Sequence, residues 1–282
     1  MDDIVKAEWI HNELKKSEQD YVVIDVRFHL ANAEAGYQDY LKGHLPEAIY
    51  VDLEKDLSSS IREHGGRHPL PNLGELAKKL GEIGIGNDTN VVVYDDQGGM
   101  VAARFWWLLK HLGHSEVAIL DGGYSKWLNE GYEVTKSIPV KPPKLFSVKV
   151  NEEWQWVDAR HVKERLNQVD TFVIDSREAN RYLGFEEPID PIAGHIPGAV
   201  NYFWKDVLTE EGLWKESEQL KIDFSGVPHS KEIIVYCGSG VSACPNVLAL
   251  KKAGYSNVKL YAGSWSDWIT HENYPIEREK QI

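Results

Sequence analysis

The chain has 282 residues, of which 42% are hydrophobic and 11% aromatic, and its formal net charge at pH 7 is -13. This length and composition allow substantial buried cores, favour two domains and argue against a disordered chain. The acidic balance lacks the basic surface that a phosphate backbone requires, so nucleic acid is not expected as a partner. The first residues contain no basic start before an apolar run, and no later stretch is long enough to span a bilayer. These features predict a soluble cytoplasmic protein without a membrane partner.

The sequence repeats itself once, with an offset of about 150 residues in the first landmark. Four landmarks recur in the same order, which predicts a duplicated fold. They are 22–27 with 172–177, 43–48 with 194–199, 91–94 with 233–236, and 125–127 with 266–268.

Strands and helices alternate along each half. Apolar runs at 21–26 and 90–94 predict buried strands, because they are apolar throughout. Helices are predicted at 100–111 and 243–253, each followed by a glycine that can end it, Gly113 or Gly254. This succession predicts an α/β fold in which each half is a mainly parallel sheet flanked by helices.

A proline-rich stretch separates the halves. Residues 137–144 read Ser-Ile-Pro-Val-Lys-Pro-Pro-Lys, and prolines block both a helix and a central strand. We therefore expect domains at 1–136 and 151–282, joined by a linker at 137–150.

The comparison of the halves separates fold from chemistry. Features that occur twice are interpreted as fold: Asp25 with Arg27, Asp175 with Arg177, and the histidine of Gly-His-X-Pro, for which His195 is expected to be a hydrogen-bonded turn residue. Features that occur once are candidates for chemistry.

The nucleophile candidate occurs once. After the matching strands, the first half continues with Asp95 and the second with Cys237. The carboxyl end of a parallel strand is where such sheets usually carry their sites. If backbone N–H groups and the next helix N-terminus face the sulfur, they stabilise a thiolate or a persulfide. A packed, inert thiol is the alternative. The loop that follows is Gly238, Ser239, Gly240, Val241 and Ser242.

The second cysteine, Cys244, lies in the first turn of the next predicted helix, beside Pro245. Two cysteines are too few for a disulfide scaffold and lack the paired spacing of a zinc site. Cys244 is expected to be a packed small side chain, with a resolving thiol as the alternative.

Further motifs at 93–95, 102–107, 120–127, 175–184 and 194–199 join the repeat. Together they resemble the tandem-domain rhodanese and 3-mercaptopyruvate sulfurtransferase family over nearly the whole chain. The resemblance implies an inactive first and a catalytic second rhodanese-like domain, and sulfur transfer through a persulfide on Cys237. It implies a small anionic sulfur donor and no metal or organic cofactor. The acceptor stays open among cyanide, a small thiol and a thioredoxin-like protein.

The same resemblance bears on the donor. Gly238 and Ser239 stand where thiosulfate enzymes typically carry cationic side chains, whereas the run Cys-Gly-Ser-Gly-Val-Ser is similar to that of mercaptopyruvate enzymes. Arg181 matches the arginine that binds the donor's anionic end, and its first-half counterpart is Ala31. A guanidinium can hold a carboxylate or sulfonate through two hydrogen bonds. The second substrate arginine of mercaptopyruvate enzymes is missing, because residues 186–192 read Glu-Glu-Pro-Ile-Asp-Pro-Ile. Mercaptopyruvate is the expected donor and thiosulfate the alternative.

The resemblance also suggests a proton relay of serine, histidine and an acid. It implies Ser239 in the loop and His44 as the histidine from the first half, with a turn histidine as the alternative for His44. Glu34 and Asp39 lie nearby in the sequence, but neither is assigned as the acid.

Two other classes are weighed against this hypothesis. Cysteine-dependent phosphatases and arsenate reductases need an arginine six residues after the cysteine, where this chain has Ala243, so the main charge clamp is missing. A non-enzymatic role, as a binding module or as a persulfide relay to a protein partner, is the remaining alternative.

Overall fold

The computed structural model describes residues 1–16 and 20–279 of the chain. They form two compact units. Among these residues, the first unit contains 1–16, 20–59, 71–151 and 210–214, and the second contains 60–70, 152–209 and 215–279. The domains predicted from the sequence placed 60–70 in the first domain and 210–214 in the second, whereas each segment packs in the other unit. A repeat pattern in the sequence cannot show which core a loop packs against.

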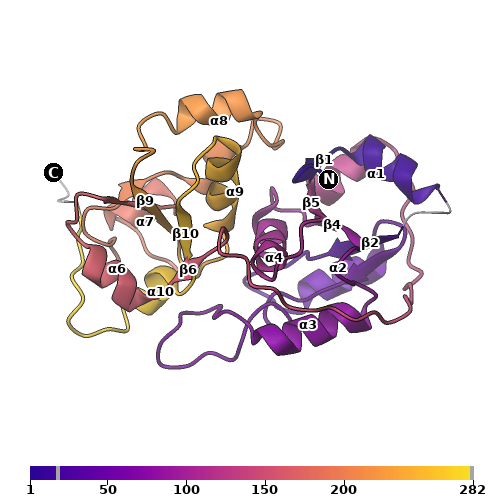
Figure 1. The fold of residues 1–282 in the computed structure, drawn as a ribbon, viewed down its shortest axis with the longest axis horizontal. Coiled ribbons are helices and arrows are strands. Elements are labelled where there is room, and N and C mark those ends of the chain that lie inside the picture. Colours follow the sequence, from indigo (N-terminus) through magenta and orange to yellow (C-terminus); the bar gives the residue numbers. More distant parts are fainter. Residues whose placement is uncertain (17–19, 280–282) are drawn as a thin grey trace. The chain divides into compact units, whose positions relative to one another are not determined.

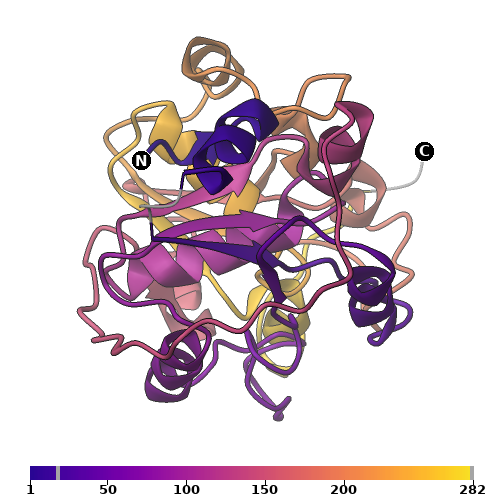
Figure 2. The ribbon, with the colours of Figure 1, turned by 90° about the vertical axis from the view of Figure 1, so that its right-hand side faces the viewer.

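The first unit is a five-stranded sheet with strand order β1-β5-β4-β2-β3 and only parallel pairs. Its strands are seen side by side in Figure 2. The strands are β1 (Ile4–Val5), β2 (Tyr21–Asp25), β3 (Ala48–Tyr50), β4 (Asn90–Tyr94) and β5 (Val117–Leu120). The helices are α1 (Ala7–Leu14), α2 (Ala35–Lys42), α3 (Leu73–Glu82), α4 (Met100–His111) and α5 (Gly123–Asn129).

The second unit repeats this strand topology, with strand order β6-β10-β9-β7-β8 and parallel pairs throughout. Its strands β6, β9 and β10 are labelled in Figure 1. The predicted α/β duplication is therefore confirmed. The strands are β6 (Trp156–Val157), β7 (Thr171–Asp175), β8 (Val200–Asn201), β9 (Glu232–Tyr236) and β10 (Val258–Tyr261). The helices are α6 (Ala159–Arg165), α7 (Ala179–Leu183), the 3-10 helix η1 (Trp204–Val207), α8 (Ser217–Asp223), α9 (Cys244–Lys252) and α10 (Ser264–Trp268).

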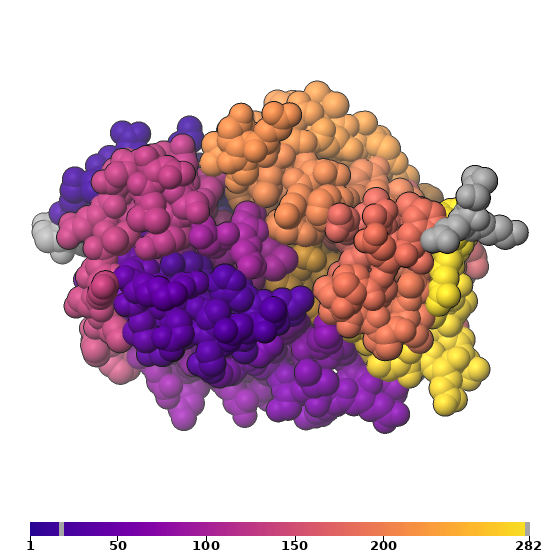
Figure 3. Space-filling view, turned by 180° about the vertical axis from the view of Figure 1, so that it is seen from behind, coloured from indigo at the N-terminus to yellow at the C-terminus, as the bar shows by residue number. Residues whose placement is uncertain are grey.

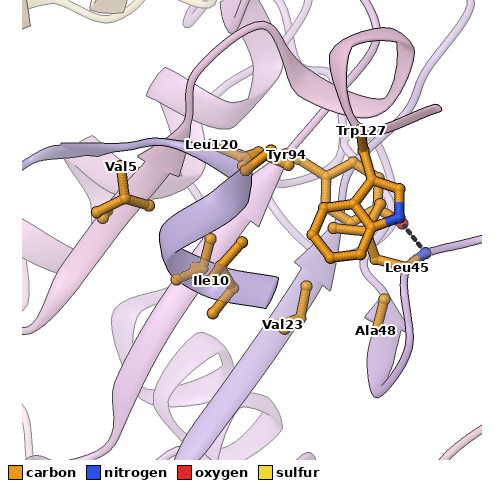
Figure 4. Packing of buried hydrophobic residues seen from close by; sticks show 11 residues of the cluster. Val5, Ile10, Val23, Leu45, Ala48, Tyr94, Leu120 and Trp127 are labelled. Atoms are coloured by element: carbon orange, nitrogen blue, oxygen red, sulfur yellow. Dashed lines mark hydrogen bonds between the residues drawn. The ribbon is translucent and has the colours of Figure 1, made fainter. Parts of the chain in front are cut away.

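The central strands are buried on both faces, which explains why their sequences are apolar throughout rather than alternating. Figure 4 shows one side of the first core, where Tyr94 packs among aliphatic side chains and its hydroxyl accepts a hydrogen bond from the N–H of Leu45 at 3.2 Å. Tyr236 accepts the corresponding bond from the N–H of Ile196 at 3.1 Å. The duplication therefore extends to individual hydrogen bonds in the cores.

The repeated aspartate and arginine pairs also have equivalent structural roles. Arg27 donates to Asp25 at 2.6 Å and to the carbonyl of Gly43 at 2.8 Å. Arg177 donates to Asp175 at 2.6 Å and to the corresponding glycine carbonyl at 2.7 Å. Each pair is buried and fixes the Gly-His-X-Pro turn to the end of a strand, as the repeat predicted.

Residues 137–150 contain no helix or strand and belong to the first unit. The stretch is tied along that unit by backbone bonds, from the N–H of Lys144 to Gly81 at 2.9 Å and from that of Lys149 to Leu112 at 3.0 Å. Over the described residues, no helix is both long and apolar enough to cross a membrane.

Candidate active site

The loop between β9 and α9 holds Cys237 directly after the strand, with its side chain almost fully buried. The N–H of Gly240 donates to its Sγ at 3.1 Å, and the N–H of Cys237 itself donates to the hydroxyl of Ser264 at 3.1 Å. A backbone donor aimed at the sulfur favours negative charge there. The loop thus has the geometry of a cradle for a thiolate or persulfide.

The two glycines of this loop are required for different structural reasons. Gly240 has φ +76°, and a Cβ there would lie 2.1 Å from the carbonyl oxygen of Ala262, so no side chain fits. A Cβ at Gly238 would lie 2.9 Å from Nη2 of Arg67 and 3.6 Å from Nη2 of Arg181. The missing side chain at 238 therefore leaves space beside the nucleophile for two guanidinium groups from distant parts of the chain.

Arg67 is carried by the segment 60–70, which packs against α10 and the residues around it. The N–H of Arg67 donates to Ser266 Oγ at 3.1 Å, and the N–H of Gly65 donates to Asp267 Oδ1 at 2.7 Å. Gly66 has φ +79°, and a Cβ there would lie 2.3 Å from the carbonyl oxygen of Gly263. The close approach that glycine permits places Arg67 next to the cysteine loop.

The guanidinium groups at the site are held by carboxylates from the loop after α7. Arg181 donates to Glu187 at 2.7 Å and to Asp190 at 3.1 Å. Glu187 also accepts from Arg177 at 3.2 Å, and Asp190 also accepts from Arg67. The residues that follow β7, coral in Figure 3, reach the molecular surface, where Glu186, Pro188 and Ile189 are exposed while Asp190 is buried.

With Asp175, this network contains three arginines and three carboxylates, so its formal charge is zero before Cys237 ionises. Burial lowers the pKa of Arg67, and the negative charge of Cys237 opposes that shift. Within the described residues, the Nε of Arg67 is buried without a hydrogen-bond partner. A buried donor of this kind gains free energy when an anion supplies the acceptor.

A histidine also contacts the loop. Nδ1 of His68 lies 2.8 Å from Oγ of Ser239, and both residues are buried. Ser239 is therefore paired with a histidine from the segment 60–70.

His44, the histidine nominated from the sequence, has a different environment. Its Nδ1 lies 2.8 Å from the carbonyl oxygen of Tyr40 and its Nε2 lies 3.1 Å from that of Ser137, and its ring stacks on Tyr40 at 3.9 Å. His195 repeats this arrangement on Tyr182, at 2.7 Å and with a stacking distance of 4.0 Å. His44 therefore has the contacts of a turn histidine, which was the alternative for this residue, and it is His68 that lies within hydrogen-bond distance of Ser239.

The remaining residues of the loop make contacts within the loop and with the start of α9. The carbonyl of Val241 accepts from the N–H of Cys244 at 3.0 Å, and Ser242 is half-buried. Cys244 is fully buried, and its thiol donates to the carbonyl of Gly240 at 3.4 Å. These contacts agree with a packed side chain, and both cysteines are thiols rather than a disulfide.

Sequence reasoning missed Arg67 and His68. A signal for them was present, because Gly65-Gly66-Arg67-His68-Pro69 has no counterpart in the second half, and features of only one half were the candidates for chemistry. Their distance in sequence from Cys237 concealed the contact.

The fold and the site together define a duplicated parallel α/β protein with a buried cysteine at a strand end and arginines beside it. The family description "Rhodanese-like domain" matches residues 6–130 and 158–271. The chain belongs to this family.

The similar proteins include sulfurtransferases of two kinds. The chain is 42% identical, over 92% of its length and 93% of the relative, to a protein of Pseudomonas aeruginosa named "Probable 3-mercaptopyruvate sulfurtransferase". It is 34% identical, over 94% of its length and 91% of the relative, to thiosulfate sulfurtransferase of Bos taurus. Among solved structures, it matches SseA of Escherichia coli, a 3-mercaptopyruvate sulfotransferase, with TM-score 0.81 and 32% identity over 94% of this chain and all of that one. These relatives confirm the predicted enzyme class, a sulfurtransferase.

Proposed function

We propose that the protein transfers sulfane sulfur from 3-mercaptopyruvate to an acceptor through a persulfide on Cys237. The observation that carries this proposal is the pair of guanidinium groups beside the backbone of the cysteine loop, together with the N–H of Gly240 directed at the sulfur. They offer an anion-binding position and a nucleophile within one loop region.

In the first step, the Cys237 thiolate attacks the donor sulfur, an S–S bond forms and the C–S bond of mercaptopyruvate breaks. The electron pair of that bond goes to carbon, and the proton of the donor thiol ends on the same carbon to give pyruvate. Ser239 and His68 lie next to the loop and are the groups that move this proton. In the second step, a thiolate or cyanide attacks the outer sulfur and releases the Cys237 thiolate.

Charge balance supports mercaptopyruvate over thiosulfate. The network of three arginines and three carboxylates has no excess positive charge, and the thiolate adds a negative one. A donor with one negative charge is repelled less in such a site than a dianion. Arg67 compensates for the second arginine that the sequence lacks near Gly194, because its buried Nε can donate to the donor's carboxylate.

For the acceptor, we propose only a class of molecule. Cyanide, a small thiol or a thioredoxin-like protein could each take the sulfur in the cytoplasm. Thiosulfate as donor is the second candidate, favoured by the bovine relative. A persulfide relay that serves only a protein partner would load sulfur but turn over slowly with small acceptors.

The donor assignment is tested by kinetics and intact mass. We expect mercaptopyruvate to leave one added sulfur on the chain with release of pyruvate, and to have a higher kcat/KM than thiosulfate. Arg181→Ala and Arg67→Ala should each lower kcat/KM for mercaptopyruvate by about 100-fold, since each removes a charged hydrogen bond to the donor. If no donor adds a sulfur, the sulfurtransferase proposal fails.

Charge variants test the reason for the preference. Glu187→Gln leaves the network with one excess positive charge, and we expect it to raise the ratio of thiosulfate to mercaptopyruvate efficiency by about tenfold. Glu186→Gln, at the exposed neighbouring residue, is the matched control and should leave the ratio unchanged. A ratio that moves equally in both variants would contradict the role of charge balance.

A further inference from the structure

A second group of ligand-type side chains lies in the second unit, outside the cysteine loop. His64, Asp267 and His271 each offer one ligand atom, and these atoms lie within 4.8 Å of one another. We propose that the three residues bind a divalent transition-metal ion, with Zn²⁺ as the best match, and that the ion clamps the segment 60–70. Two imidazole nitrogens and one carboxylate oxygen are a donor set that zinc accepts, with water in the fourth position.

Two of the ligands already have coordination spacing. Nε2 of His271 lies 3.4 Å from Oδ1 of Asp267. Tetrahedral zinc with ligand bonds of about 2.0–2.2 Å separates neighbouring ligand atoms by roughly 3.4 Å. Within the described residues, this Nε2 is buried and has no hydrogen-bond partner. A buried polar atom without a partner is costly, and an ion between it and the carboxylate removes that cost.

A hydrogen bond to Thr270 selects the tautomer of the third ligand, His64. The hydroxyl of Thr270 donates to the carbonyl oxygen of Asp267 at 2.7 Å, so it acts as acceptor toward Nδ1 of His64, 2.8 Å away. The proton of His64 is therefore on Nδ1 and its lone pair on Nε2. A hydrogen bond at the opposite ring nitrogen is typical of metal-binding histidines.

His64 has room to complete the coordination. It is exposed, and its ring stacks on that of His271 at 4.2 Å with an interplanar angle of 10°. Parallel rings cannot both direct a lone pair at one ion, so binding requires the His64 ring to tilt out of the stack while its Nδ1 stays bonded to Thr270. Since His64 lies on a surface loop, this rotation leaves the core intact.

Asp267 is oriented before any ion binds. Its Oδ1 accepts from the N–H of Gly65 at 2.7 Å, and its Oδ2 accepts from the hydroxyl of Tyr261 at 2.8 Å. Its counterpart in the repeat is Lys126, a cation that cannot serve as a ligand beside a bound metal. The carboxylate ligand therefore occurs only in the second half of the repeat, whereas His64 comes from the first half of the sequence.

Metal binding would affect the cysteine loop through two residues of the segment 60–70. Arg67 and His68 follow His64 by three and four residues and contact the region of the cysteine loop. An ion that joins His64 to Asp267 and His271 would suppress opening of this segment. Metal binding itself is independent of the proposed function, and only its effect on the active site rests on that function.

The experiment uses the full chain with Cys237→Ser, so that the active-site thiol cannot take the ion and no persulfide can form. Zn²⁺ is titrated by calorimetry and Co²⁺ by its absorption spectrum. We expect one ion per chain, with affinity reduced at least about tenfold by His64→Ala and by Asp267→Asn. His229→Ala is the matched control, because His229 is exposed and stacks on Tyr255 at 3.9 Å, and it should keep the affinity.

Hydrogen exchange supplies a readout that needs no activity. With Zn²⁺ at 100 times its Kd, exchange in residues 60–70 should slow by about 100-fold in the parent and stay unchanged in His64→Ala. Absence of binding to the parent, or equal affinity in His64→Ala and His229→Ala, overturns the metal site. Binding without slower exchange overturns the clamp.

Discussion

The loops after β4 and β9 occupy equivalent positions in the two units. In each loop, at least one backbone N–H group is directed at the side chain that follows the strand, but the side chains and the nearby charges differ. In the first, the carboxylate of Asp95 accepts four backbone hydrogen bonds, from Gln97 at 2.9 Å, Gly99 at 2.9 Å, Val101 at 2.8 Å and Ala102 at 3.1 Å. The loop therefore encloses an anion that the chain itself supplies.

In the second, the smaller side chain of Cys237 receives the N–H of Gly240, and arginine side chains stand beside the loop. The first loop closes on its own carboxylate, whereas the second holds a thiol with two guanidinium groups beside it, which we propose receive an external anion. The two loops differ in the residue at the strand end and in the charges around it. This difference makes the first loop structural and the second a candidate reactive site.

The largest effect should come from converting the second loop into the first. Cys237→Asp should keep the fold and abolish persulfide formation, with turnover reduced on the order of 10⁴-fold or more, because the nucleophile is lost. Intact mass after incubation with donor and steady-state kinetics measure both effects.

Cys244→Ser is the control for this change, since a serine hydroxyl can keep the bond to the carbonyl of Gly240. It should retain full persulfide loading. Residual loading in Cys237→Asp that disappears in Cys244→Ser would move the nucleophile to the second cysteine and undo the comparison.

A smaller effect should distinguish the two candidate histidines. His68→Ala should lower kcat with mercaptopyruvate by about 100-fold and leave KM nearly unchanged, since it removes the partner of Ser239 but no donor contact. His44→Ala should instead lower the free energy of unfolding by about 1–3 kcal/mol without changing kcat, because it removes a buried stacked ring. Kinetics and denaturant unfolding check the pair, and the opposite pattern would restore His44 to the relay.

The smallest effect concerns the acid of the first loop. Burial raises the pKa of Asp95 above its ordinary 3.8, although four backbone N–H groups oppose the shift. The stability that this group contributes is fully present below the unfolded pKa and is lost as pH rises through the raised folded value.

Relative to Asp95→Asn, which keeps the shape without the charge, the wild type should therefore lose unfolding free energy over that window. The slope should not exceed about 1.4 kcal/mol per pH unit. Parallel denaturant titrations of both proteins measure it. A difference that grows with pH would mean that the four hydrogen bonds outweigh burial.

Much of the fold was open to sequence reasoning because its signals are local. The helix predicted at 100–111 is α4, and that predicted at 243–253 is α9 to within one residue at each end. Apolar runs at 21–26 and 90–94 are the buried strands β2 and β4. Continuous apolar character and a terminating glycine are properties of a few adjacent residues, so they can be recognised without knowledge of the tertiary fold.

The site was predictable only in part. Cys237 and its loop follow a strand directly, so their position could be inferred, whereas sequence reasoning indicated only His44 as a partner for Ser239 and missed His68. The motif around His44 resembled a functional one because it is repeated, but repetition reflects the Gly-His-X-Pro turn. Nothing in local spacing indicates that residues 60–70 pack on the second unit.

The sequence by itself determined the duplication, the parallel α/β architecture and the one cysteine that directly follows a strand, because each is encoded in periodicity and in the comparison of two aligned halves. Only the tertiary structure decided which charges surround that cysteine. Arg67 and Asp190 are 123 residues apart in sequence, and their ion pair beside the loop depends on long-range packing that glycine-permitted close contacts allow. Electrostatics acts through space, so residues remote in the chain set the charge at the site.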